Sequence, residues 1–291
     1  MEAKSRVFIV GAKGYIGRRL LEKAKAKYVV YGTSSTVAAD AIHLQLAQPL
    51  GFDYCNIQST DVVLLTAAIS SPDVCAKDHE HAWSVNVTGS SQFIAQVIER
   101  SGRVIFFSSD TVYGERKTEC DELADCQPAG EYAVMKCEVE RRFQGDPNFK
   151  SIRLSYVFSR EDKFTRYLIS CAEKGEEAEL FHPFYRAVVH RDDIVDGTLA
   201  LAQRWEGFPQ QILNFGGPGL VSRIEFAECL QRTALPHLKF RVTEPDEAFF
   251  ENRPRMIAMS SPYLGQLLGR PARTLCEAVG IEFGKHGIQE N

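Results

Sequence analysis

Short hydrophobic runs alternate with longer amphipathic segments along the first half of the chain. The hydrophobic runs predict strands at residues 6–10, 28–31, 42–44, 62–65, 104–108 and 151–154. Several of these runs are almost continuously apolar, as strands are when both faces of a parallel sheet are covered. The amphipathic segments predict helices at residues 15–26, 82–100 and 132–143. This alternation predicts an α/β fold in which right-handed βαβ units build a doubly wound parallel sheet.

The pattern becomes mixed after about residue 155. Helical periodicity predicts helices at residues 164–173, 192–203 and 224–233, and a late strand at 237–242. We therefore expect a sheet domain over residues 1–155 and a smaller, mixed α/β C-terminal substrate lobe over residues 156–291. Segments around residues 187–222 are expected to return to the first domain. Such a lobe would cover the carboxyl ends of the strands, where doubly wound folds bind their ligands.

Composition and charge exclude several classes of protein. The 291 residues are 44% hydrophobic and 25% charged, as in an ordinary globular protein. The net charge of −4 gives no basic excess for binding nucleic acid or an anionic membrane. No apolar run reaches the roughly 18 residues of a membrane-spanning helix, and no signal peptide is recognisable. We expect a cytoplasmic protein with neither a nucleic-acid nor a membrane partner.

The eight cysteines are scattered along the chain, without CxxC spacing or a histidine at ligand distance. Spacing of this kind indicates neither a zinc site nor a disulfide framework. We therefore expect reduced thiols and no bound metal.

The first predicted strand runs directly into the segment Gly11-Ala12-Lys13-Gly14-Tyr15-Ile16-Gly17, which opens a predicted helix. In such a strand–loop–helix unit the three glycines allow a tight turn, close approach of a pyrophosphate, and close packing of helix on strand. The helix N-terminus offers free N–H groups and the positive end of a dipole to the phosphates. The loop therefore predicts a dinucleotide site of the Rossmann type. Its expected cofactor-binding residues are Gly11, Lys13, Gly14, Tyr15, Ile16 and Gly17.

The end of the second strand bears on the choice of cofactor. Enzymes that prefer NAD usually place an acid there, which binds the ribose 2′-hydroxyl. This chain instead has Thr33, Ser34 and Ser35, whose hydroxyls would accept a 2′-phosphate without repelling it. Lys13 would neutralise that phosphate. The segment favours NADP(H), with NAD(H) as the alternative.

Ser109, Tyr132 and Lys136 form a candidate catalytic set. Tyr132 and Lys136 are one helical turn apart on the same face of a predicted helix. A phenol with a pKa near 10 is a poor base, but a neighbouring ammonium favours the phenolate. Tyr132 would then exchange a proton with a substrate oxygen while a hydride moves to or from a nicotinamide. Ser109, at the end of the fifth strand, would hydrogen-bond the same oxygen.

These motifs together resemble the extended short-chain dehydrogenase/reductases. The resemblance rests on the glycine loop, on Thr66-Ala67-Ala68, on Asn86, on Ser108–Gly114 and on Tyr132–Lys136. The later segments Arg186–Ile194, Leu213–Gly217 and Arg253-Pro254 also match, so the resemblance covers nearly the whole chain. This family includes nucleotide-sugar epimerases, 4,6-dehydratases and 4-ketoreductases.

The resemblance implies further roles. Ala67 and Ala68 would lie against the cofactor, as would Asn86, which would also support Lys136 through a water relay. Ser70, Ser109, Arg186 and Arg253 would bind the substrate, a nucleotide-linked sugar, with the arginines on its diphosphate. A homodimer is a candidate assembly.

The residues after Ser109 discriminate between reactions. The 4,6-dehydratases have Thr-Asp-Glu where this chain has Ser109-Asp110-Thr111, and Thr111 cannot replace the glutamate base. Asp110 resembles the rhamnose-type reductases and is a second candidate proton donor. The resemblance favours an NADPH-dependent 4-ketoreductase of a nucleotide-activated deoxysugar. The alternatives are an NAD-dependent nucleotide-sugar 4-epimerase and a non-catalytic, cofactor-binding regulatory subunit.

Overall fold

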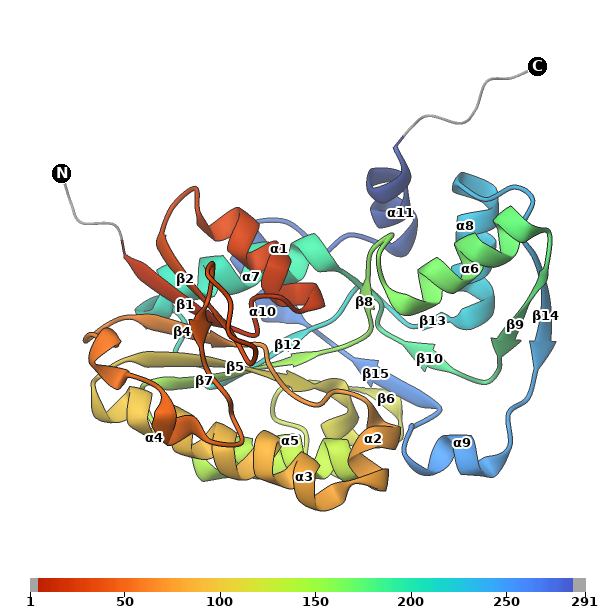
Figure 1. Ribbon diagram of the computed structural model, residues 1–291. Coiled ribbons are helices and arrows are strands. Elements are labelled where there is room, and N and C mark those ends of the chain that lie inside the picture. Colours follow the sequence, from red (N-terminus) through yellow and green to blue (C-terminus); the bar gives the residue numbers. More distant parts are fainter. Residues whose placement is uncertain (1–4, 285–291) are drawn as a thin grey trace.

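The computed structural model, which describes residues 5–284, has a central sheet of seven parallel strands in the order β12-β7-β5-β4-β1-β2-β3 (Figure 1). Their bounds are β1 Arg6–Val10, β2 Val29–Ser34, β3 Ile42–His43, β4 Val62–Leu65, β5 Arg103–Ser109, β7 Phe149–Leu154 and β12 Ile212–Phe215. The strand order reverses between β1 and β4. Doubly wound sheets open a crevice at the carboxyl ends of the strands at this point.

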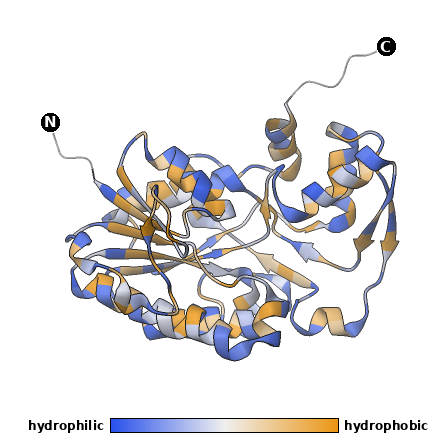
Figure 2. Ribbon diagram, viewed as in Figure 1, coloured by the Kyte–Doolittle hydropathy of each residue, from blue (hydrophilic) through white to orange (hydrophobic). Residues whose placement is uncertain are grey.

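Helices cover both faces of the sheet (Figure 1). On one face lie α1 Tyr15–Ala24, α7 Arg191–Gln203 and α10 Pro262–Leu268. On the other lie α4 Ser90–Glu99 and α5 Glu131–Arg142. Figure 2 shows hydrophobic and hydrophilic residues on each of these helices, as expected where only one side packs on a sheet. The α/β fold class predicted from the sequence is confirmed.

The helix predicted at residues 82–100 has three parts. It comprises α3 His79–Trp83, a π-helical turn at Ser84–Gly89, and α4. Gly89 ends the π-helical turn, and a Cβ at this position would lie 1.5 Å from the Leu46 carbonyl oxygen. The helix is therefore packed against the segment after β3 more closely than any side chain would allow. The short α2, Pro72–Lys77, precedes this region.

The rest of the chain forms a second layer beyond the carboxyl ends of the strands (Figure 1). Its strands are β6 Arg116–Cys120, β8 Val157–Phe158, β9 Glu177–Phe181, β10 Tyr185–Arg186, β11 Val189–His190, β13 Val221–Ser222, β14 Lys239–Thr243 and β15 Met256–Met259. Its helices are α6 Lys163–Lys174, α8 Arg223–Thr233, α9 Glu247–Glu251 and α11 Leu275–Phe283. Helices α6, α8 and α11 share a separate hydrophobic core with β9. No helix within residues 5–284 is long and apolar enough to cross a membrane.

The expectation that all cysteines are reduced is wrong for one pair. Cys229 on α8 and Cys276 on α11 form a disulfide, with their Cα atoms 6.0 Å apart. The two residues are 47 positions apart in sequence, so spacing gave no signal. The packing of α8 on α11 brings them together.

A buried ion pair fixes α5 to the sheet. Arg153 of β7 donates from its Nη2 atom to the Glu140 carboxylate of α5 at 2.6 Å, and both side chains are only 6% exposed. The Ser151 hydroxyl donates to the same carboxylate at 2.8 Å. Since α5 also carries Tyr132 and Lys136, this pair sets the position of the candidate catalytic residues.

Replacing Glu140 with Gln should destabilise the protein by about 3–5 kcal/mol, because it leaves the buried Arg153 cation without its anion. Urea denaturation provides the measurement. Glu138→Gln is the matched control, since Glu138 lies on the same helix but pairs with Arg141 and Arg142 at the surface, where ion pairs contribute little. Equal, small effects of both variants would contradict the proposed role of the buried pair.

Candidate active site

Two connected hollows lie at the carboxyl ends of the strands. The larger has a volume of about 1140 Å³ and opens between the sheet and the second layer. The smaller, of about 420 Å³, follows the glycine loop. Four residues line both hollows: Tyr15, Ser70, Tyr132 and Leu154. A molecule in one hollow would therefore meet a molecule in the other beside Tyr132.

The smaller hollow, here called the cofactor cleft, gathers the residues predicted to bind a dinucleotide. It is lined by Gly11, Lys13, Gly14, Tyr15, Ile16, Gly17, Thr33, Ser34, Ser35, Ala67, Ala68, Tyr132 and Lys136. Gly11 has a φ of +85° and touches Ala67, so a side chain would be strained there. At Gly17 a Cβ would lie 2.2 Å from the Gly11 carbonyl oxygen. Helix α1 begins here without a side-chain cap, which leaves its first N–H groups for a ligand.

Lys13 lies at the mouth of this cleft, on the loop opposite the end of β2. Its ammonium is 3.8 Å from the Asp40 carboxylate, and both side chains are more than half exposed. Exposed pairs of this kind are weak, so the ammonium can exchange its partner for a phosphate. Thr33 and Ser34 are buried, whereas Ser35 is exposed.

The Ser–Tyr–Lys set comes together from β5 and α5. Lys136 is 3% exposed and donates from Nζ to the Phe107 carbonyl oxygen at 2.7 Å. The same ammonium lies 5.6 Å from the centre of the Tyr132 ring. The Ser109 hydroxyl oxygen accepts from the Thr111 hydroxyl at 2.9 Å and from the Thr111 N–H at 3.3 Å. Its own proton is donated to the Asp110 carboxylate, over a longer distance of 3.4 Å.

One expectation about this set is wrong. We expected Lys136 to lower the pKa of the Tyr132 phenol, but burial raises that pKa well above its ordinary value of 10, and the charges of Cys75 and Asp110 raise it further. Burial also lowers the pKa of Lys136 to about 8. The sequence places the two groups on one helical face, but it does not show that both are desolvated. Tyr132 is therefore protonated at neutral pH.

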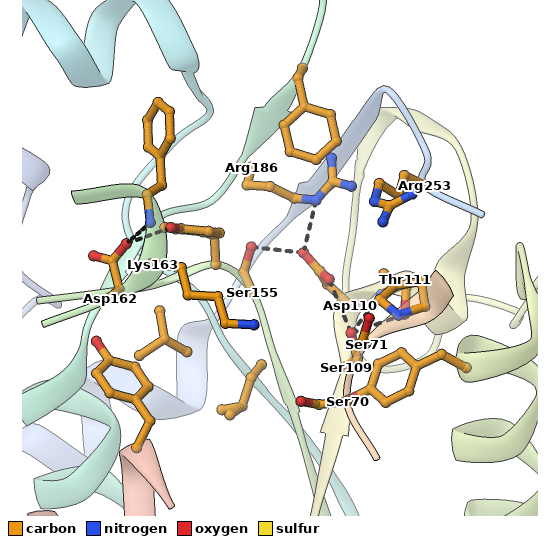
Figure 3. Close-up of a pocket in the computed structure, with 18 of the residues that line it drawn as sticks. Ser70, Ser71, Ser109, Asp110, Thr111, Ser155, Asp162, Lys163, Arg186 and Arg253 are labelled. Carbon is orange, nitrogen blue, oxygen red and sulfur yellow. Dashed lines mark hydrogen bonds and ion pairs between the residues drawn. The ribbon is translucent and has the colours of Figure 1, made fainter. Parts of the chain in front are cut away.

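Asp110 is buried beside the set and connects β5 to the second layer (Figure 3). Its carboxylate accepts from the Ser155 hydroxyl at 2.8 Å and lies 3.7 Å from Nε of Arg186. Burial raises the pKa of Asp110, while the charge of Arg186 and the hydrogen bond from Ser155 oppose that shift. Asp110 is thus already engaged by a cation and a hydroxyl.

The two arginines predicted to bind substrate both line the larger hollow, but they differ in burial and in hydrogen-bond partners. Arg186 is buried, and its Nη1 and Nη2 atoms donate to the carbonyl oxygens of Tyr185 and Pro254 at 2.7 and 2.8 Å. Arg253 is less buried and forms an ion pair with Asp73 of α2 at 2.5 Å. Arg253 can reach a ligand by exchanging one surface partner, whereas Arg186 is held in the wall.

The sequence reasoning missed several cations of the larger hollow. Arg223, at the start of α8, packs over the Phe164 ring at 3.8 Å and forms no ion pair with a carboxylate of the described residues. Lys163 extends from the start of α6 into the hollow (Figure 3). A Ser-x-x-Glu capping box at Ser222–Glu225 would have placed Arg223 at a helix N-terminus. No comparable signal showed that this terminus faces the crevice.

Asn86 lies in the π-helical turn and does not line either hollow. Its side-chain oxygen accepts from the Ile69 N–H at 2.8 Å, and its amide donates to the Ile69 carbonyl at 3.0 Å. Asn86 thereby holds the segment that carries Ala67, Ala68 and Ser70 against the cleft. The water relay to Lys136 stays a prediction.

The doubly wound sheet, the glycine loop and the Ser–Tyr–Lys set define the Rossmann-type class that includes the extended short-chain dehydrogenase/reductases. Within it, the chain belongs to the family described as the RmlD substrate binding domain, whose model matches residues 5–279. It is 24% identical over 293 residues to dTDP-4-dehydrorhamnose reductase from Aggregatibacter actinomycetemcomitans, covering 98% of this chain and 94% of that relative. The resemblance found in the motifs is confirmed.

Solved structures share the fold over nearly the whole chain. A mutant UDP-glucuronic acid 4-epimerase from Bacillus cereus has a TM-score of 0.82 at 18% identity, covering 96% of this chain and 98% of the other. A dTDP-4-dehydrorhamnose reductase from Bacillus anthracis, solved with NADP, has a TM-score of 0.79 at 18% identity, covering 97% and 99%. At these identities the likeness establishes the fold alone.

The ammonium of Lys136 should lose its proton as the pH rises through about 8, well below the ordinary lysine pKa of about 10.4. Nuclear magnetic resonance of the protein with ¹³C-labelled lysine side chains measures this directly. Lys150, whose pKa burial lowers to about 8 as well, should give a second shifted signal. Lys136→Met and Lys150→Met assign the two signals. A Lys136 midpoint above 10 would contradict the desolvated site.

Proposed function

We propose that this protein is an NADPH-dependent 4-ketoreductase of a nucleotide-activated deoxysugar. One observation carries the proposal: Tyr132 lies on the wall common to the cofactor cleft and the larger hollow. Ser109 lines the larger hollow and Lys136 lines the cleft, on either side of Tyr132. A protonated phenol between a dinucleotide site and a substrate site suits proton donation during a carbonyl reduction.

Charge supports a diphosphate as the anchor of the substrate. Six basic residues line the larger hollow, against four acidic ones: Arg18, Lys163, Arg166, Arg186, Arg223 and Arg253, with Asp73, Asp110, Glu161 and Asp162. Arginine forks bind phosphate oxygens in pairs. We assign diphosphate binding to Arg253 and Arg223. Arg186 would act mainly by holding Asp110 and the cavity wall.

NADP(H) is the proposed cofactor. The proposal rests on Lys13 and on the hydroxyls at the end of β2, which suit a 2′-phosphate. The Bacillus anthracis reductase was solved with NADP, which agrees with this choice. The Bacillus cereus epimerase was solved with NAD, so NAD(H) stays the alternative.

The side chains divide the proposed reaction between them. NADPH, when bound, supplies the hydride that adds to the keto carbon. The Tyr132 hydroxyl donates its proton to the carbonyl oxygen, and burial keeps that proton in place at neutral pH. Ser109 orients the same oxygen when its hydroxyl proton turns from the Asp110 carboxylate, 3.4 Å away, to the substrate. The Lys136 ammonium donates one of its three protons to the Phe107 carbonyl oxygen. The other two protons can be donated to Tyr132 and to the cofactor ribose.

Reduction and epimerisation differ in their use of cofactor. Thr111 has no carboxylate to serve as the base of a dehydratase, and Asp110 is engaged by Ser155 and Arg186. A reductase should consume one NADPH for each molecule of a dTDP- or UDP-linked 4-keto-sugar, followed by the fall in NADPH absorbance. Turnover of a nucleotide sugar without net change in cofactor would identify the epimerase instead. Cofactor binding without turnover of any such sugar would favour the regulatory subunit.

Tyr132→Phe should lower kcat by about 10²–10⁴-fold, because the ring is kept while the proton donor is lost. NADPH binding, measured by quenching of protein fluorescence, should be nearly unchanged. Tyr28→Phe is the control, since that hydroxyl donates to the Leu199 carbonyl far from the cleft. If Tyr132→Phe stays active while Asp110→Asn is inactive, the aspartate is the proton donor.

Lys13→Ala should weaken NADPH binding and leave NADH binding almost unchanged, because only NADPH has a 2′-phosphate for the ammonium. Fluorescence titration of both cofactors gives the two dissociation constants. Lys27→Ala removes another exposed ammonium from the same domain and should alter neither. An equal loss of affinity for both cofactors would show that Lys13 does not contact the 2′-phosphate.

A further inference from the structure

Three contacts join the helices that cover the sheet to the short segment between β8 and α6 in the second layer. The Tyr15 hydroxyl, at the start of α1, forms a hydrogen bond with the Ser159 hydroxyl, 2.6 Å away. On the next residues of α1, Nη2 of Arg18 lies 3.2 Å from the Glu161 carboxylate. Nη1 of Arg191, at the start of α7, lies 2.5 Å from the same carboxylate. These three contacts are here called the bridge.

The second-layer side of the bridge is a turn that is held to α6. Ser159 is buried, and its hydroxyl oxygen accepts from the Glu161 N–H at 3.1 Å. The Asp162 carboxylate accepts from the Ser159 N–H at 3.2 Å. The same carboxylate caps α6, since it accepts from the N–H groups of Phe164 and Thr165, both at 3.0 Å. The bridge therefore connects α1 and α7 to the second layer as a body.

The sheet side of the bridge holds the Tyr15 ring from two directions. Its hydroxyl is bound by Ser159, and the Arg191 guanidinium lies 5.0 Å from the centre of the ring. The ionic contact of Arg18 with Glu161 is weaker, because the two side chains are 55% and 51% exposed. One neutral hydrogen bond and one exposed ion pair can break and form again.

The bridge lies beside the position that a pyrophosphate would take. The first turn of α1 follows the glycine loop and has no side-chain cap, and such a turn offers its N–H groups to phosphates. Tyr15 belongs to this turn and lines both hollows. A dinucleotide that lies along the cofactor cleft, with its nicotinamide at Lys136, would therefore pass the bridge at its pyrophosphate.

We propose that Ser159 and Glu161 are positioning residues that slow the release of the bound dinucleotide. They act through Tyr15 and Arg18, which they hold beside the pyrophosphate, and need no contact with the cofactor themselves. This inference rests on the proposed function, because it requires that the cleft binds a nicotinamide dinucleotide. A reductase exchanges its cofactor in every turnover, so the bridge opens and closes once for each molecule of substrate.

The rate of NADPH release gives the first measurement. The full-length protein with bound NADPH is mixed with excess NADP⁺ in a stopped-flow instrument, and the NADPH fluorescence is followed. Ser159→Ala and Tyr15→Phe should each speed release about 2- to 10-fold, the factor that corresponds to one neutral hydrogen bond. The double variant should be no faster than the single ones, because both remove the same bond. Ser84→Ala is the control, since that hydroxyl donates to the His81 carbonyl outside both hollows.

The ionic contacts of the bridge are tested in the same way. Glu161→Gln should speed NADPH release about 2- to 5-fold, because Arg18 and Arg191 lose their common anion. Glu22→Gln is the matched control. Glu22 also pairs with an arginine of α1, Arg19 at 3.0 Å, but that contact stays within the helix. Its removal should leave the release rate unchanged.

The possible results separate the bridge from the proposed function. Unchanged release of NADPH from Ser159→Ala and Tyr15→Phe would overturn the bridge and leave the cofactor site standing. So would effects that multiply in the double variant, because the two hydroxyls would then act independently. If the wild type binds NADH in place of NADPH, the same variants are compared by the release of NADH. A wild-type protein that binds neither cofactor would overturn the proposed function and the bridge with it.

Discussion

The placement of α5 depends on one buried interaction, the ion pair between Glu140 and Arg153. Two charges with almost no exposure are costly to separate, so the pair favours the register of helix on sheet in which the two side chains meet. In that register the Lys136 ammonium donates to the Phe107 carbonyl oxygen, and Tyr132 lies on the wall between the two hollows. The same guanidinium reaches past Glu140 to Cys126. A single arginine thereby holds α5 on the sheet and contacts the loop that leads into this helix.

The site separates two tasks that a sugar-nucleotide reductase must perform in one crevice. The cleft side is built from backbone, glycines and small hydroxyls, which suits a ligand recognised along its pyrophosphate. The other side is built from long cationic side chains supplied by the second layer. Asp110 and Arg186 join the two sides across the layers. Their mutual engagement explains why an aspartate so close to Ser109 need not serve as the acid.

The sequence predicted most of the fold because hydrophobic periodicity follows the sheet closely. Each strand proposed in the first half exists, with ends shifted by a few residues, and every residue proposed for the cofactor cleft except Asn86 lines it. The glycine loop could be recognised as a dinucleotide site because the spacing of its glycines is set by local steric limits. The charge state of Tyr132, by contrast, depends on desolvation by distant segments, which no spacing encodes. Arg223 and the disulfide were missed for the same reason: both depend on how helices of the second layer pack.

The late position of β12 has a consequence for the order in which the protein can fold. β7 is buried along its whole length, and one of its two edges pairs with β12, which is made some 60 residues later. A chain still emerging from the ribosome would therefore expose β7 as a sheet edge with unpaired backbone groups. Such edges recruit other strands and promote aggregation. In the folded protein the buried Lys150 ammonium donates to the carbonyl oxygens of Phe208 and Gln210, in the segment that leads into β12, so this edge is closed only after β12 has been made.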